Sequence, residues 1–193
     1  TSSSDFETET GTLGLDYSWP LTEFQSVRMG IAVQRSDLFT DPNSSAAEAL
    51  YWVQNNGNTY TEVQNVGIPP IALTYYGTRF DTFEYSLGWS YDSRNRALFA
   101  DRGSRHRLSA SYALPFSDID FVSFNYDYLQ FIPVSKWFTL MFNSEAGYGQ
   151  ALGDTTSMPP YRRFFAGGPE TVRGYRESRM GPKDSFGNPY GGN

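Results

Sequence analysis

Large apolar side chains alternate with small or polar ones along much of the chain. In residues 12–21, one side carries Leu13, Leu15, Tyr17, Trp19 and Leu21, and the other carries Thr12, Gly14, Asp16 and Ser18. A period of two is typical of a β-strand with one apolar face. Pro20 marks the end of this strand. After a short turn at 22–25 the alternation resumes over 27–34, which predicts an antiparallel hairpin.

Four further segments have the same period, and they lie at 82–92, 106–114, 122–128 and 138–148. The sequence therefore predicts six antiparallel strands over residues 1–149. Most segments have roughly the 9–11 residues that a tilted strand needs to cross a bilayer. A soluble antiparallel sandwich also alternates, but its strands average about 5–6 residues and rarely carry so many aromatic side chains on one face. The pattern favours a transmembrane β-barrel.

The two faces of these segments differ in what they can contact. Aromatic residues stand near the ends of the apolar faces, as the interfacial girdles of a barrel require. We assign His106, the only histidine, to this aromatic row rather than to a ligand set. The opposite faces carry Asp16, Arg28, Glu84, Asp92, Arg107, Asp127 and Glu145. Such charges cost little on the hydrated lumen wall of a barrel but are expensive in hydrocarbon.

Residues 36–79 break the alternation and are expected to form a long extracellular loop. Pro42, Pro69 and Pro70 interrupt it. The run from Ser45 to Glu48 has the form of a helix capping box, which predicts a short helix at about 46–54. A loop of this length is unusual in a compact soluble domain but normal on the outer side of a membrane barrel. The Asp101-Arg102-Gly103 triplet is interpreted as part of a turn.

Composition narrows the range of functions. The 193 residues carry a net charge of −6, which disfavours a nucleic-acid partner because phosphate binding needs a basic face. Cysteine is absent and histidine occurs once, so no catalytic, cofactor or metal site is predicted. A hydrolase that uses paired carboxylates is the competing enzymatic hypothesis. The strand alternation already explains those carboxylates as lumen lining. The chain starts without a signal peptide, which is compatible with a mature chain or a fragment.

An unusual run follows the last strand: Phe164-Phe165-Ala166-Gly167-Gly168-Pro169-Glu170-Thr171-Val172-Arg173-Gly174-Tyr175. The backbone must turn at Gly167 and Gly168, since glycine pairs followed by proline do not continue regular structure. Gly174 allows a wall or another backbone to lie close to Arg173. Taken alone, the run is equally compatible with an ordinary surface turn.

This run, together with Gly88-Trp89-Ser90-Tyr91-Asp92 and Gly147-Tyr148-Gly149 before it, resembles the BamA family of outer-membrane protein assembly factors. The Val-Arg-Gly-Phe/Tyr element is the signature of the wider superfamily. The resemblance implies a sixteen-stranded barrel of which these segments are strands six to eleven. Residues 150–193 would then begin a loop inserted into the lumen, and the element Val172-Arg173-Gly174-Tyr175, with Glu170 before it, would be its functional motif. The family's arginine, Arg173 here, meets an acidic residue of the inner wall.

That acidic residue lies beyond Asn193 in the family, and Glu145 and Asp127 are possible substitutes in this chain. Six strands cannot close a membrane barrel, whose smallest members have about 8, so we expect a fragment.

The resemblance implies that the protein helps outer-membrane proteins to fold and insert without nucleotide. The implied partners are membrane lipid, nascent β-barrel proteins, and accessory lipoproteins bound through periplasmic POTRA domains. The alternative is a two-partner-secretion transporter that exports one specific protein.

Overall fold

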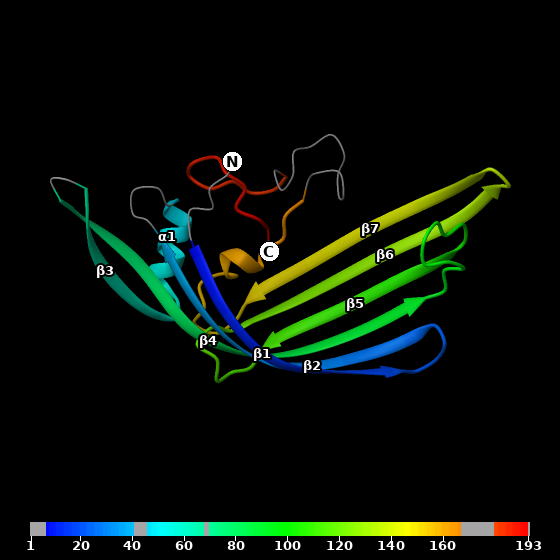
Figure 1. Cartoon of the computed structure of the whole chain (residues 1–193), viewed down its shortest axis with the longest axis horizontal. Helices are drawn as coiled ribbons and strands as arrows, with labels where there is room; N and C mark the ends of the chain where they lie inside the picture. Colours follow the sequence, from blue (N-terminus) through cyan, green and yellow to red (C-terminus); the bar gives the residue numbers. More distant parts are fainter. Residues whose placement is uncertain (1–6, 41–45, 68–69, 167–179, 193) are drawn as a thin grey trace.

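The computed structural model describes residues 7–40, 46–67, 70–166 and 180–192. It contains one curved antiparallel sheet (Figure 1). The strands are β1 (Glu7–Pro20), β2 (Gln25–Thr40), β3 (Asn58–Val66), β4 (Ile71–Asp92), β5 (Gly103–Ala113), β6 (Phe121–Ser135) and β7 (Phe138–Ala151). The helical elements are α1 (Ala47–Asn55) and a 3₁₀ turn at Pro160–Arg162. No helix among the described residues is long and apolar enough to cross a membrane.

The sheet order is β1-β2-β4-β5-β6-β7, and each strand pairs antiparallel with the next. These six strands correspond to the six predicted alternating segments, so that prediction is confirmed. In the described part of the chain, one edge of β1 and one edge of β7 have no partner strand. The sheet is therefore open, as expected of part of a barrel wall.

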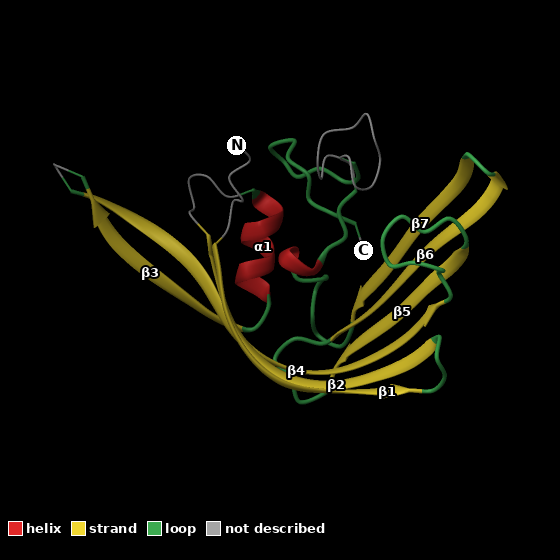
Figure 2. Cartoon of the chain, turned by 45° about the vertical axis from the view of Figure 1, so that its right-hand side comes forward, coloured by secondary structure: helices red, strands yellow, loops and turns green. Residues whose placement is uncertain are grey.

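The predicted long loop over residues 36–79 contains strands that the sequence pattern did not indicate. β2 continues to Thr40, β4 begins at Ile71, and β3 pairs with the first half of β4 from Asn58↔Arg79 to Val66↔Ile71. The resulting β3–β4 hairpin extends beyond the rest of the sheet (Figure 2). Side chains such as those of Val63 and Ile71 are exposed there, because no described element forms a second layer over the hairpin. A strand without a buried face needs no apolar alternation, so the pattern could not reveal it.

The predicted helix at 46–54 is confirmed as α1, but its N-cap is not the predicted Ser45. The N-cap is Ala46, which makes no side-chain capping bond. Ser45 lies outside the described residues. Glu48 forms hydrogen bonds with Ser185 instead, a contact across 137 positions of sequence.

The apolar face of the sheet points outward and is exposed. Leu13, Leu15 and Ile31 have 80%, 75% and 57% of their surface accessible. The polar face is concave, and both α1 and the C-terminal segment lie against it (Figures 1 and 2). We call this concave face the lumen wall. An exposed apolar face opposite a covered polar one is the arrangement of a membrane barrel and not of a soluble sandwich.

The outward apolar band runs obliquely across the sheet. On β1 it extends from Leu13 to Leu21, just beyond the strand, with Tyr17 at its middle. The hydrogen-bonded row that starts at Tyr17 passes through Met29, Leu87, Ala110 and Phe124 and ends at Tyr148. On β7, however, Tyr148 is at one end of the apolar stretch and Phe138 is at the other. A band that lies level in the membrane falls at a different position on each successive strand when the strands are tilted. Closure of a sheet into a barrel requires such a tilt.

The outward face also carries a row of aromatic rings that includes His106. Its Nδ1 lies 2.9 Å from the hydroxyl oxygen of Tyr126, and its ring is 4.8 Å from that of Tyr128 and 5.7 Å from that of Tyr91. The prediction that this histidine belongs to an aromatic row is confirmed.

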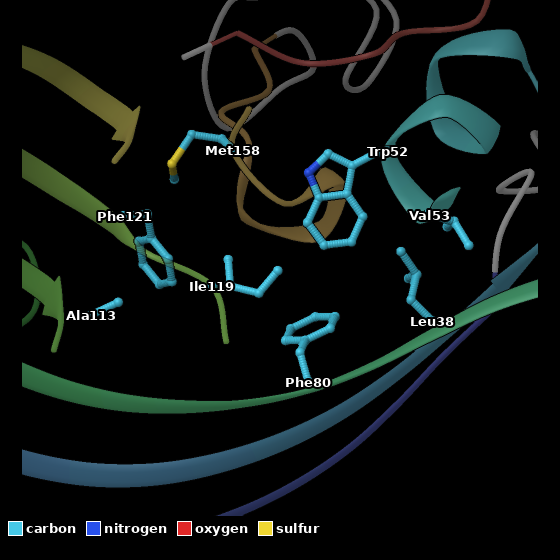
Figure 3. Packing of buried hydrophobic residues seen from close by; sticks show 8 residues of the cluster. All are labelled: Leu38, Trp52, Val53, Phe80, Ala113, Ile119, Phe121 and Met158. Atoms are coloured by element: carbon cyan, nitrogen blue, oxygen red, sulfur yellow. The ribbon is translucent and has the colours of Figure 1, made fainter. Parts of the chain in front are cut away.

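The buried core lies on the lumen wall near the helix (Figure 3). Its members are Leu38, Trp52, Val53, Phe80, Ala113, Ile119, Phe121 and Met158. The strand residues among them continue the lumen-facing rows, which become apolar where the helix and the C-terminal segment cover them. Trp52 of α1 packs edge-on against Phe80 of β4 at 5.7 Å between ring centroids. Burial of these side chains attaches both connections to the sheet.

Candidate functional site: a loop seated on the lumen wall

The predicted signature residues lie outside the described part of the chain. They are Gly167, Gly168, Glu170, Val172, Arg173, Gly174 and Tyr175. The segments on either side are described, and we call residues 157–166 the upstream limb and residues 180–192 the downstream limb. The signature motif lies between the two limbs in the sequence. The position of the limbs on the lumen wall therefore fixes the two ends of the segment that carries the motif.

The two limbs are bridged to each other. The backbone N–H of Met180 donates to the carbonyl of Ala166 at 2.9 Å. Phe164 and Gly192 exchange two backbone hydrogen bonds, of 3.0 and 2.8 Å. The segment that carries the motif therefore begins and ends at neighbouring positions.

The upstream limb rests on two glycines of β7. A Cβ atom added at Gly147 would lie 2.6 Å from the ring of Phe164, and one added at Gly149 would lie 2.9 Å from the methyl group of Met158. Real side chains do not approach so closely, so this stretch of wall must lack side chains for the limb to sit there. The alternating glycines, both on the lumen face, form a flat seat.

Asp127 and Glu145 lie beside this seat. They occupy directly opposed positions on β6 and β7. They also line an open hollow of about 680 Å³ together with Phe164, Ala166 and Met180. Two like charges directly opposite on a sheet disfavour each other unless a cation lies between them. Among the described residues neither carboxylate has an ion-pair partner.

A different arginine attaches the loop to the wall. Arg162, on the 3₁₀ turn, pairs with Glu84 of β4 at 2.6 Å and donates to the side-chain oxygen of Gln34 at 3.1 Å. Its guanidinium also lies 5.5 Å from the ring centroid of Phe121. Only 12% of the Glu84 side chain is accessible, so loss of Arg162 would leave a shielded carboxylate without its partner, which costs more than breaking a surface pair.

Sequence reasoning placed Glu84 on the lumen wall but did not find its partner. The available signal was the pair Arg162-Arg163, which precedes a motif expected in the lumen. Which wall residue they would reach depends on how the loop folds back, and no local pattern encodes that.

Arg163 joins the two limbs. Its guanidinium stacks 3.7 Å from the ring centroid of Tyr190 and donates to the Met158 carbonyl and the Ser157 hydroxyl. Removal from water lowers the pKa of Arg163, because burial disfavours the charged form. The same burial raises the pKa of the Tyr190 hydroxyl. The contact holds the limbs through packing as well as charge.

These features, an outward lipid-type surface and a loop folded onto the lumen wall, agree with the comparison to known families. The model of the Omp85 superfamily domain matches residues 1–193. The chain belongs to the Omp85 superfamily. It is a protein of the bacterial outer membrane, and its sheet is part of an Omp85 barrel.

Two relatives define the likeness further. The chain is 31% identical, over 198 aligned positions, to the outer membrane protein assembly factor BamA of Neisseria meningitidis serogroup B. That alignment covers 100% of this chain and 23% of the relative. The crystal structure of BamA from Haemophilus ducreyi lacking POTRA domains 1–3 superimposes with a TM-score of 0.80 at 21% identity. It covers 97% of this chain and 36% of that structure. This Omp85 domain thus spans about a quarter of the length of its Neisseria relative.

Proposed function

We propose that this chain is the central barrel segment of a factor that folds and inserts outer-membrane proteins without nucleotide. The observation that carries the proposal is a loop seated on the lumen wall of an Omp85 sheet, whose two described limbs flank the signature motif in the sequence. The 31% identity to an outer membrane protein assembly factor supports the same role.

The proposed partners follow from the surfaces. Membrane lipid contacts the outward apolar band, and unfolded β-barrel proteins are the clients. Accessory lipoproteins act through periplasmic domains of the whole protein. The proposed role is not enzymatic: Glu84 holds the loop through Arg162, and Asp127 and Glu145 line the lumen.

Within this proposal Arg173 pairs with a carboxylate of the inner wall, and the candidates are Asp127 and Glu145, which line the hollow beside both limbs. A guanidinium in a narrow lumen requires such an acceptor. We expect Arg173→Ala, in the full-length protein, to lower the temperature at which the barrel loses its folded gel mobility. It should also reduce the levels of other outer-membrane proteins several-fold in cells that depend on this copy.

Arg176→Ala, in the same segment but outside the four-residue motif, is the matched control, and we expect it to have little effect. Wild-type levels of client proteins and unchanged barrel stability in the Arg173→Ala protein would contradict the role assigned to Arg173. A protein that keeps its clients at normal levels but loses export of one secreted partner would instead indicate a secretion transporter.

A further inference from the structure

The first turn of α1 is capped by a residue from the downstream limb. The hydroxyl oxygen of Ser185 accepts a hydrogen bond from the Ala47 backbone N–H at 3.1 Å. In return, the carboxylate of Glu48 accepts from the backbone N–H and the hydroxyl of Ser185, at 3.1 and 3.0 Å. This is the reciprocal exchange of a capping box, with the serine supplied from 138 residues away. A hydrogen bond to its own backbone, together with these bonds from Ser185, lowers the pKa of Glu48, so its charged form is favoured.

The last turn of α1 is bound to the segment that leads into the upstream limb. The indole N–H of Trp52 donates to the Ser157 carbonyl at 2.9 Å. Asn56, directly after the helix, donates to the Thr156 hydroxyl at 2.7 Å and accepts from the Thr156 backbone N–H at 2.8 Å. Trp52 and Asn56 are almost completely buried, so these bonds are protected from water.

Both limbs are therefore fixed to the same nine-residue helix, one at each end. They are also joined to each other through the bonds between Phe164 and Gly192 and through the stacking of Arg163 on Tyr190. The contacts form a closed ring that runs from α1 to one limb, across to the other limb, and back to α1.

We infer that α1 is a clip that holds both ends of the signature-bearing segment, so that the connection after β2 and the connection after β7 open as one cooperative unit. Separate local contacts would open independently, each at its own rate. In a ring, loss of one contact weakens the others, because each limb is positioned by the rest. The helix thereby links the connection after β2 to the loop on the lumen wall.

Hydrogen–deuterium exchange of the full-length protein in lipid nanodiscs tests the clip. The Ser185→Ala variant removes the hydroxyl cap but leaves the backbone unchanged. We expect exchange to accelerate roughly fivefold in peptides covering α1 and residues 180–190, the usual effect of losing a helix cap. The cooperative unit further requires a similar acceleration in the peptide covering residues 152–163, which contains no contact to Ser185. Unchanged exchange in that peptide would overturn the inference.

Conservative variants separate the hydrogen bonds from the charge. Glu48→Gln can still accept from the Ser185 backbone N–H and should exchange at close to the wild-type rate, whereas Glu48→Ala should match Ser185→Ala. Glu62→Ala, on exposed β3, is the control for loss of a surface carboxylate. The reciprocal variant Thr156→Val should accelerate exchange in the peptide covering 180–190. If Thr156→Val accelerates exchange only in residues 152–163 and α1, the contacts open independently, and the inference that α1 acts as a clip is contradicted.

Discussion

At the scale of single residues, a lumen-wall charge that the loop covers is stabilised by a partner from the loop itself. Glu84 is largely buried, and Arg162 reaches it from the 3₁₀ turn. By contrast, Arg35 and Asp81 form an equally short pair on the outward face, where 69% of the arginine side chain is accessible. Solvent and salt weaken the outward pair, so only the inner one is expected to hold the fold.

We expect Arg162→Ala to destabilise the folded barrel by about 1–3 kcal/mol, because it leaves the Glu84 carboxylate partly buried without a partner. Arg35→Ala is the matched control and should cost less than about 1 kcal/mol. The measurement is the urea midpoint of unfolding in detergent micelles. Equal midpoint shifts for the two variants would show that Arg162 acts as an ordinary surface arginine.

At the scale of elements, six strands were predictable because one face of each meets lipid and the other meets water. The β3–β4 hairpin has no such contrast, and the same pattern missed it. α1 was found from the spacing of Ser45 and Glu48, yet among the described residues Ser185 is the serine that binds Glu48. A capping rule recognises a helix start but not a partner that arrives from another loop.

The pairing of loop and wall was unpredictable for the same reason. Glu84, Asp127 and Glu145 could be placed on one face from their parity alone. No local sequence pattern predicts that Arg162 pairs with Glu84. Nor does one predict that the limbs lie beside Asp127 and Glu145. Such contacts depend on the return path of a long connection, which the residues nearby do not encode.

The glycine seat on β7 gives a prediction at this scale. Gly147→Ala should push Phe164 away from the wall and destabilise the loop by about 1–3 kcal/mol, the usual cost of overpacking. Gly11→Ala is the control, since no atom of the described structure lies within 4 Å of its added Cβ. Protease cleavage within residues 152–166 reports the displacement. Combining Gly147→Ala with Phe164→Leu should partly restore protection, and a failure to do so would argue against direct contact.

At the scale of the whole molecule, the sheet separates a lipid-type surface from a polar lumen. The oblique apolar band from Leu13 on β1 to Phe138 on β7 defines how the strands tilt through the membrane. In the part of the chain that the structure describes, the loop and α1 cover the concave side toward one end of the sheet (Figure 2). The polar hollow beside Asp127 and Glu145 is therefore open on the remaining side.

The two faces should respond differently to a new charge. Leu15→Arg places a guanidinium on the outward face, at a cost of about 2–4 kcal/mol near the bilayer midplane. Asn125→Arg adds the same charge to the hollow beside Asp127 and Glu145, where it should be neutral or stabilising. The fraction of full-length protein that folds into liposomes measures both. Equal losses for the two variants would mean that the faces are assigned wrongly.

The most direct test of the central claim is a folding assay with the purified full-length protein in phospholipid liposomes. An unfolded outer-membrane β-barrel client is added in the absence of nucleotide, and its protease-resistant, heat-modifiable form is followed over time. The account predicts several-fold faster folding than in protein-free liposomes, and a loss of that acceleration in the Arg173→Ala protein. Client folding at the protein-free rate, or acceleration only after ATP is added, would contradict it.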